Sequence, residues 1–392
     1  MHDPSHTNPE PDFAALRERA FNLRWATVAP DVIPLTAACP DLPVARAVTD
    51  AIAHYIAKPH LCYGPACGLP AFREAVAQHF AREKSAAVDA ARVIATNSAA
   101  SAIALVARHL LRAGDEVVVQ DPVDFLVAES ARRAGATLRF WTPDANGRFT
   151  LDGLRAAVTP NTRALSVCHP HNPLGTLWSA EEVAEIAGFA RERGIALISD
   201  EVWSDVLLDG ARLASFAGVS PAAWVVYGLS KGYALAGLRI GAVIAPDARA
   251  AEEFAAAQGF DHTIEGAATV SQIAATAALD HCGAWRANFL AHCTAQRDRA
   301  IAHLRTLDGV RIERAPQATF VLFADISRTG IAEDVLAARI EQHARVRVVP
   351  GSPRWFGAGA AGHVRLSLAT TRGVLDEALA RIERAWPAVT AR

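Results

Sequence analysis

The chain has 392 residues, 51% of them hydrophobic and 20% charged, which is the composition of a packed globular protein and excludes a disordered or collagen-like one. Lys plus Arg (39) nearly equals Asp plus Glu (41), so the basic surplus expected of a nucleic-acid binder is missing. No run approaches the roughly 18 apolar residues of a membrane span, and the start, MHDPSHTNPEPDF, has no apolar signal-peptide core. We therefore expect a cytoplasmic protein without nucleic-acid or membrane partners.

The six cysteines do not suggest a disulfide framework, because a long chain without a secretion signal more often carries buried thiols. His281–Cys282 and His292–Cys293 resemble a pair of metal ligands. A helix joining them would hold the two pairs about 16 Å apart, which is too far for them to share one ion. We expect no metal site.

Helices and short apolar strands alternate from about residue 45 to 250. The helix at 179–194 begins with Ser179 and Glu182 at capping-box spacing. In chain order the pattern predicts a helix over 71–82, a strand over 92–96, a helix over 101–114 closed by Gly114, a strand over 116–120, the end of a helix over 129–136, a strand over 163–167, the helix over 179–194, and strands over 195–199, 224–228 and 240–245.

Unbroken apolar strands alternating with helices are typical of a parallel sheet buried on both faces. Beyond residue 285 the pattern changes to a helix over 284–307, strands over 318–326, 345–349 and 363–369, and a last helix from 373. The predicted fold class is α/β: a large domain with a mostly parallel sheet flanked by helices, plus a smaller α+β domain. The predicted divisions are 1–45 (an N-terminal arm and part of the small domain), 46–285 (the large domain) and 286–392 (the small domain).

Polar side chains follow three of the predicted strands at their carboxyl ends, where α/β proteins bind ligands. An amide, a carboxylate, an amine and a guanidinium at one sheet edge suit pyridoxal phosphate. The amine can form a Schiff base, the carboxylate can keep the pyridine nitrogen protonated, and the guanidinium can pair with the phosphate. The residues in question are Asn172, Asp200, Ser230, Lys231 and Arg239.

Five motifs in order resemble the fold type I pyridoxal-phosphate enzymes, in the class I/II aminotransferase group near its cystathionine β-lyase-like branch. The resemblance covers about residues 30–390 and implies transfer of an amino group between an amino acid and a 2-oxo acid. The alternatives are carbon–sulfur β-elimination and another specialised amino-acid modification, since all of them share the cofactor residues. The motifs are YGPACGLPAFREAV (63–76), PHNPLG (170–175), SDEVW (199–203), SKGYALAGLRIG (230–241) and HVRLSLA (363–369).

The resemblance assigns roles to the residues at the strand ends. Lys231 is expected to be the catalytic Schiff-base lysine, and Asp200 the partner of the pyridine nitrogen. Asn172 is expected to donate to the ring's 3-oxygen, while Ser230 and Arg239 bind the phosphate.

Residues elsewhere in the chain complete the expected site. Backbone amides near Ser98, Ala99 and Ala100, at the start of a helix, also match phosphate ligands. Arg365 matches the arginine that binds the substrate's α-carboxylate. Tyr63 matches a tyrosine that reaches the phosphate of the neighbouring subunit, which implies a homodimer with shared active sites.

Two of the departures from the family pattern concern aromatic side chains. Trp203 stands where aminotransferases usually have Tyr, so an indole N–H replaces an ionisable phenol. In DPVDF the aromatic side chain that stacks on the cofactor is expected at Asp124. We therefore predict that the neighbouring Phe125 takes that part.

Overall fold

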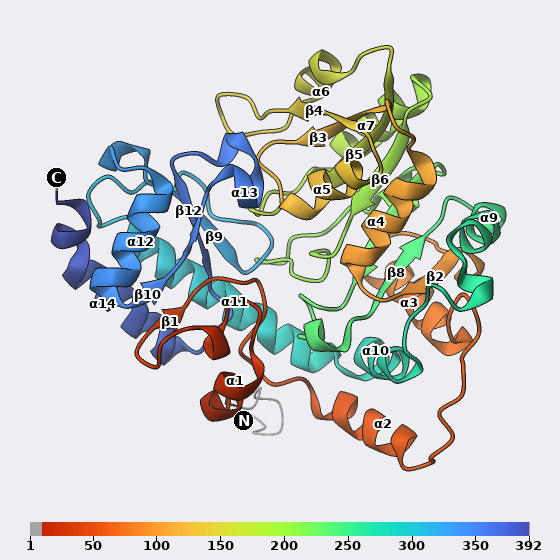
Figure 1. Ribbon diagram of the computed structural model, residues 1–392, viewed down its shortest axis with the longest axis horizontal. Coiled ribbons are helices and arrows are strands. Elements are labelled where there is room, and N and C mark those ends of the chain that lie inside the picture. Colours follow the sequence, from red (N-terminus) through yellow and green to blue (C-terminus); the bar gives the residue numbers. More distant parts are fainter. Residues whose placement is uncertain (1–9, 392) are drawn as a thin grey trace.

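The computed structural model describes residues 10–391, so the first nine residues of the predicted N-terminal arm lie outside it. The chain forms a larger body around one long sheet and a smaller body near the C-terminus (Figure 1). Within the described residues no helix is both long and apolar enough to cross a membrane.

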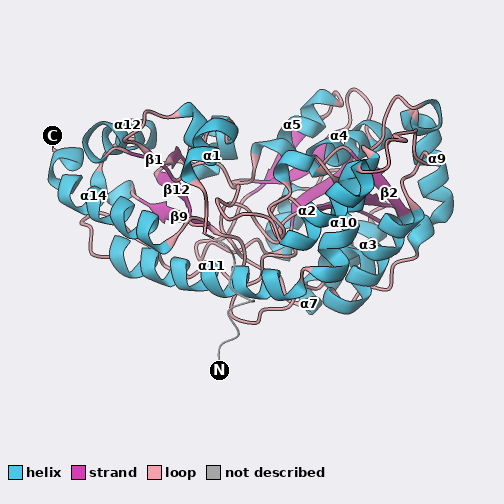
Figure 2. Ribbon diagram, turned by 90° about the horizontal axis from the view of Figure 1, so that it is seen from below, coloured by secondary structure: helices cyan, strands magenta, loops and turns pink. Residues whose placement is uncertain are grey.

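The larger body is built on a seven-stranded sheet with helices on both sides (Figure 2). β8 runs antiparallel to both of its neighbours, and the other adjacent strands are parallel. β2, β7 and β8 are buried at every residue, which explains their continuous apolar runs. The predicted mostly parallel sheet is thus confirmed. The spatial order is β2 (Val93–Thr96), β8 (Gly241–Ile244), β7 (Ala223–Gly228), β6 (Ala196–Asp200), β5 (Thr162–Cys168), β3 (Glu116–Gln120) and β4 (Thr137–Trp141).

The helices of the larger body connect these strands and cover them. The predicted capping box is present: Ser179 Oγ accepts from Glu182 N (3.2 Å), and Glu182 Oε2 accepts from Ser179 N (2.8 Å). The helix predicted to extend to Gly114 ends earlier, at Leu110. The helices are α2 (Arg46–Ile56), α3 (Pro70–Glu83), α4 (Ala99–Leu110), α5 (Phe125–Arg133), α6 (Leu151–Ala157), α7 (Ala180–Glu192), α8 (Phe216–Val219), α9 (Ala248–Gln258) and α10 (Thr269–His281).

The smaller body joins the two ends of the chain. An antiparallel sheet has the order β11 (Val349–Pro350), β12 (His363–Ser367), β9 (Val321–Asp325), and β1 (Ile33–Pro34) pairs in parallel with β10 (Val346–Arg347). The pairing of β1 with β10 brings the N-terminal segment onto the C-terminal third. The accompanying helices are α1 (Phe13–Arg19), α11 (Gly283–Leu304), α12 (Glu333–Ala344), α13 (Pro353–Phe356) and α14 (Arg372–Thr390).

Two large hydrophobic clusters lie inside these bodies, beside a small third one of Val349, Phe356 and Ala360. Trp25 and Leu35 belong to the smaller of the two large clusters together with C-terminal residues. The helix α11 serves both clusters, because Phe289 packs in the larger one and Ile301 in the smaller one. The domain boundaries after residues 45 and 285 stay a prediction.

Two strands differ from the prediction. β4 was not predicted, because it is the edge strand and most of its residues are exposed, so it lacks an apolar run. The single strand predicted over 345–349 is divided at Val348 between β10 and β11, which belong to different sheets.

Candidate active site

A cavity of about 210 Å³ opens at the carboxyl ends of β5, β6 and β7. Because these strands are parallel neighbours, the residues that follow them meet at one edge of the sheet. Nine of the predicted site residues line this cavity: Ser98, Ala99, Ala100, Asn172, Asp200, Trp203, Ser230, Lys231 and Arg239.

One end of the cavity is suited to a phosphate group. Arg239 Nη2 donates to Ser98 Oγ (2.7 Å), and Ser98 caps α4 by accepting from Ser101 N (3.1 Å). The amides of Ala99 and Ala100, in the first turn of α4, have no acceptor within the helix. A guanidinium beside a helix amino end favours a bound anion.

A buried carboxyl group lies in the same cavity. Asp200 ends β6 and is 7% exposed, and its Oδ1 accepts from Val202 N (3.1 Å). Burial raises the pKa of Asp200 to about 7, and the nearby negative charge of Asp124 adds to this effect. Burial in the cavity disfavours the ionised form of Asp200. A cationic group brought next to Asp200 would therefore stabilise this carboxylate and be stabilised by it.

The amine of Lys231 belongs to a residue that lines the same cavity. Its Nζ donates to the carbonyl oxygen of Ala38 (2.6 Å) and lies 5.2 Å from the centre of the Trp203 ring. Lys231 is partly exposed and lines the cavity. Desolvation by the surrounding protein lowers the pKa of its amine below the ordinary value. A lowered pKa increases the neutral, nucleophilic fraction of the amine.

Arg365 does not line the cavity but contacts a residue that does. Its Nη1 donates to Asn172 Oδ1 (3.2 Å), and its Nη2 donates to Thr36 O (3.2 Å). Its Nε has no hydrogen-bond partner among the described residues, although it is buried. Burial lowers the pKa of Arg365 to about 10, so the guanidinium is still cationic at neutral pH. It is placed to bind a carboxylate that enters beside Asn172.

Two predicted residues lie away from the cavity. Tyr63 is 90% exposed and borders a separate surface groove together with Leu61. Phe125 is 38% exposed, is absent from the cavity lining, and packs edge-on against Trp355 with ring centres 5.9 Å apart.

The cavity also contains residues that sequence reasoning did not assign to it. Asp124 lines it and accepts from Asn172 Nδ2 (2.8 Å). The signal was available, because Asp124 occupies the position expected to face the cofactor. Ala38 and Cys39 reach the lining from the N-terminal segment, and no motif marks them.

The donor set fits pyridoxal phosphate. Its phosphate needs a cation and helix amides, its aldehyde needs an amine, and its ring nitrogen needs a buried carboxylate. Arg239 with the start of α4, Lys231 and Asp200 supply these groups within one cavity.

Comparisons with known proteins agree with this donor set. Residues 30–382 match the family "Aminotransferase class I and II". The chain is 30% identical to an aspartate aminotransferase from Bacillus sp. (strain YM-2), over 90% of this chain and 91% of the relative. It is 31% identical to an aspartate/prephenate aminotransferase from Thermus thermophilus, over 94% of each. The solved aromatic aminotransferase from Pyrococcus horikoshii OT3 superposes with a TM-score of 0.84 at 29% identity, covering 91% of this chain and 95% of that one.

Proposed function

The chain belongs to the aminotransferase class I and II family, and we propose that its cavity moves an amino group between an amino acid and a 2-oxo acid with Lys231 as the catalytic amine. One observation carries the assignment of Lys231. The whole chain has three lysines, at positions 58, 84 and 231. Lys58 is exposed on the surface, and Lys84 is buried in an ion pair with Asp205 (2.6 Å). Lys231 is the one that lines the cavity.

The cofactor is pyridoxal phosphate, which when bound supplies an aldehyde for the substrate amine and a ring that accepts the electron pair of the Cα–H bond. We expect Arg239, Ser230 and the first amides of α4 to hold its phosphate, with Asn172 beside its ring. Asp200 would keep its ring nitrogen protonated, because a buried carboxylate gains most from a cationic neighbour.

The remaining roles follow from the positions of Lys231 and Arg365. The neutral Nζ of Lys231 would take the proton from the substrate's Cα and deliver it to the carbon on the other side of the amine nitrogen, as general base and then acid. Arg365 binds the substrate's α-carboxylate with the donors that its contacts to Asn172 and Thr36 orient. The ring of Trp203, with its centre 5.2 Å from the Lys231 Nζ, limits where the amine can move.

Borohydride reduction followed by peptide mass spectrometry tests the assignment. We expect the cofactor-loaded protein to carry a phosphopyridoxyl group on the Lys231 peptide. Lys231→Ala should lose both the label and at least about 10³-fold of the transamination rate, because Lys231 supplies the amine that lines the cavity. Lys58→Ala is the matched control and should keep both.

Labelling at Lys58 or Lys84 would overturn the assignment. Amino-acid panels with and without 2-oxoglutarate test the reaction itself. Formation of pyruvate and a thiol from cystathionine without an oxo acid would favour β-elimination instead.

We propose further that the protein is a cytoplasmic homodimer in which Tyr63 of each subunit reaches the other's active site. The exposure of Tyr63 and Leu61 supports a partner surface at this place. The six free cysteines fit a reducing compartment.

A further inference from the structure

We propose that Asp124 selects the substrate: its carboxylate disfavours amino acids with an acidic side chain and favours those whose side chain donates hydrogen bonds. The inference rests on the proposed function, because Asp124 lines the same cavity as Lys231.

The carboxylate of Asp124 is fixed in place. Its Oδ1 caps α5 by accepting from Leu126 N (3.1 Å), and its Oδ2 accepts from Asn172 Nδ2 (2.8 Å). The backbone N–H of Asp124 also donates to Asn172 O (3.1 Å). Each carboxylate oxygen can accept a further hydrogen bond. The group therefore stays at the wall of the cavity with acceptor capacity left.

The charge of Asp124 is not balanced by a bonded cation. Its two side-chain hydrogen bonds among the described residues come from a backbone amide and an uncharged side-chain amide. The three cations nearest the cavity bond to other groups, namely Arg239 to Ser98, Lys231 to Ala38 and Arg365 to Asn172. Lys231 and Arg365 are close enough for the charge of Asp124 to oppose the lowering of their pKa values by desolvation, yet neither bonds to it, so the Asp124 carboxylate stays open to whatever enters.

The three cations also have tasks that every substrate shares. Arg239 is engaged by the cofactor phosphate, Lys231 by the proton at Cα, and Arg365 by the α-carboxylate. The cavity can therefore discriminate between amino-acid substrates only through the side chain beyond Cα. A side-chain carboxylate in this partly desolvated cavity is repelled by Asp124, whereas an amide of the same shape can donate to a free lone pair. Some relatives are named aspartate aminotransferases. A preference against acidic side chains would therefore distinguish this chain from them.

Aspartate against asparagine, and glutamate against glutamine, are matched pairs for the test. The half-reaction with the amino donor alone, followed by the absorbance of the bound cofactor, removes any dependence on the acceptor. We expect the amide to react about 10- to 100-fold faster than the acid, as a second-order rate constant. Asp124→Asn should reduce each ratio to within about 3-fold, because it removes the charge while its Oδ1 still caps α5; its amide nitrogen replaces the oxygen that accepted from Asn172. Asp124→Ser, also a capping residue, serves if the first variant folds poorly.

A surface variant controls for the change in net charge. Asp152→Asn, in the exposed first turn of α6, removes the same charge far from the cavity and should leave both ratios unchanged. Equilibrium binding supplies a readout without turnover. Calorimetric titration should show maleate binding at least about 10-fold tighter to Asp124→Asn than to the unaltered protein, with propionate changed by less than about 3-fold.

The two failures can be told apart. Suppose that borohydride labels Lys231. If the unaltered protein then reacts faster with the acids, or if Asp124→Asn leaves the rate ratios and the maleate affinity unchanged, Asp124 does not select the substrate, and the proposed function stands. If Lys231 is not labelled, the proposed function itself fails.

Discussion

Gly241, at the start of β8, lies directly behind the amino end of α4. A Cβ at this position would lie 2.5 Å from Ala99 N and 2.6 Å from the carbonyl carbon of Ser98. Both are backbone atoms, so they cannot rotate away as a side chain can. The absence of a side chain at Gly241 therefore lets the phosphate end of the cavity form.

Gly241→Ala should displace the first turn of α4 and weaken the binding of pyridoxal phosphate by about 10-fold or more. Titration of the cofactor-free protein, followed by absorbance, measures this. Gly188→Ala is the control, because a Cβ at Gly188 in α7 would meet no atom within 4 Å. Equal affinity in the two variants would contradict the role of Gly241.

Single residues differ in how far the sequence predicts them. Lys231 and Asp200 were predictable because each follows an apolar strand whose direction is set by burial. The sequence does not assign Asp124 to the site, because an aromatic residue is expected to face the cofactor at this position. Ala38 and Cys39 were not predictable, since their place in the lining depends on contacts with residues far along the chain, such as the hydrogen bond from Lys231.

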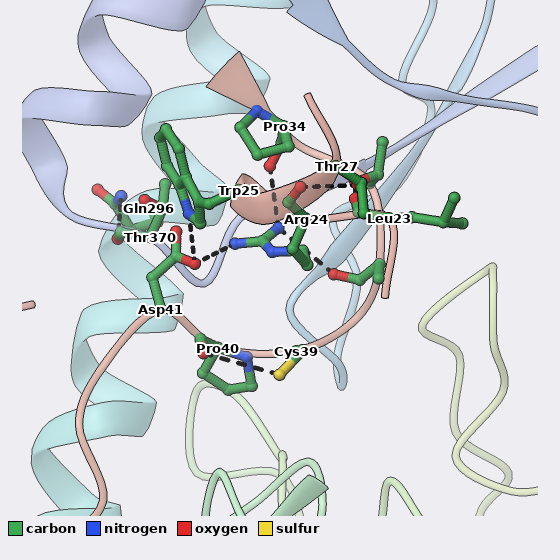
Figure 3. Close-up of polar contacts among 12 residues, drawn as sticks. Leu23, Arg24, Trp25, Thr27, Pro34, Cys39, Pro40, Asp41, Gln296 and Thr370 are labelled. Carbon is green, nitrogen blue, oxygen red and sulfur yellow. Dashed lines mark hydrogen bonds and ion pairs between the residues drawn. The ribbon is translucent and has the colours of Figure 1, made fainter. Parts of the chain in front are cut away.

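Among the structural elements, the N-terminal segment 23–41 has the most direct effect on the site. Figure 3 shows Arg24 between Asp41 and Pro34. Arg24 donates to the Asp41 carboxylate and to Pro34 O (2.9 Å), and Trp25 Nε1 donates to Asp41 Oδ1 (2.8 Å). Arg24 and Asp41 are 3% and 4% exposed. This buried pair holds the turn whose Ala38 carbonyl accepts from the Lys231 amine.

Asp41→Asn leaves the Arg24 guanidinium buried without its counter-ion, which should lower the free energy of unfolding by about 3–5 kcal/mol. The KM for the amino acid should rise as well, because the turn at residues 36–39 contacts Arg365 through Thr36. Denaturant unfolding and steady-state kinetics measure the two effects.

The exposed pair of Asp31 and Arg345 (2.7 Å) offers a control within the same segment. Asp31→Asn should change neither the stability nor the KM measurably, because solvent screens this pair. If Asp41→Asn also left both the free energy of unfolding and the KM unchanged, the buried pair would have no part in shaping the site.

Elements were predictable where burial on both faces makes long apolar runs, as in β3, which matches its predicted bounds at Glu116 and Gln120. The edge strand β4 lacks such a run. The division at Val348 could not be read from RVRVV, because it is set by which neighbouring strands are available to pair.

At the scale of the whole molecule, the segment leading to Tyr63 leaves apolar surface uncovered. Ile56, Leu61 and Tyr63 are 53%, 68% and 90% exposed, and they border a groove of about 760 Å³ against the start of α10. Isolated apolar side chains on a surface are ordinary, but a cluster of them favours an interface. A second copy of the chain is the proposed occupant.

Sedimentation analysis should therefore give a dimer, and Leu61→Asp should shift it towards monomer with loss of most activity, because Tyr63 then no longer reaches the partner's site. Val335→Asp, on the exposed side of α12, introduces the same charge elsewhere and should leave a dimer. A fully active monomer would refute the shared active site.

The helix α11 limits how the two bodies can move. It is 22 residues long, about 33 Å at 1.5 Å per residue, and one end packs in each of the two large hydrophobic clusters. Because Phe289 and Ile301 are on the same rigid rod, the bodies cannot slide apart along it. A change in the opening between the strand carrying Arg365 and the loop carrying Lys231 would therefore require α11 to bend or its packing at one end to give way.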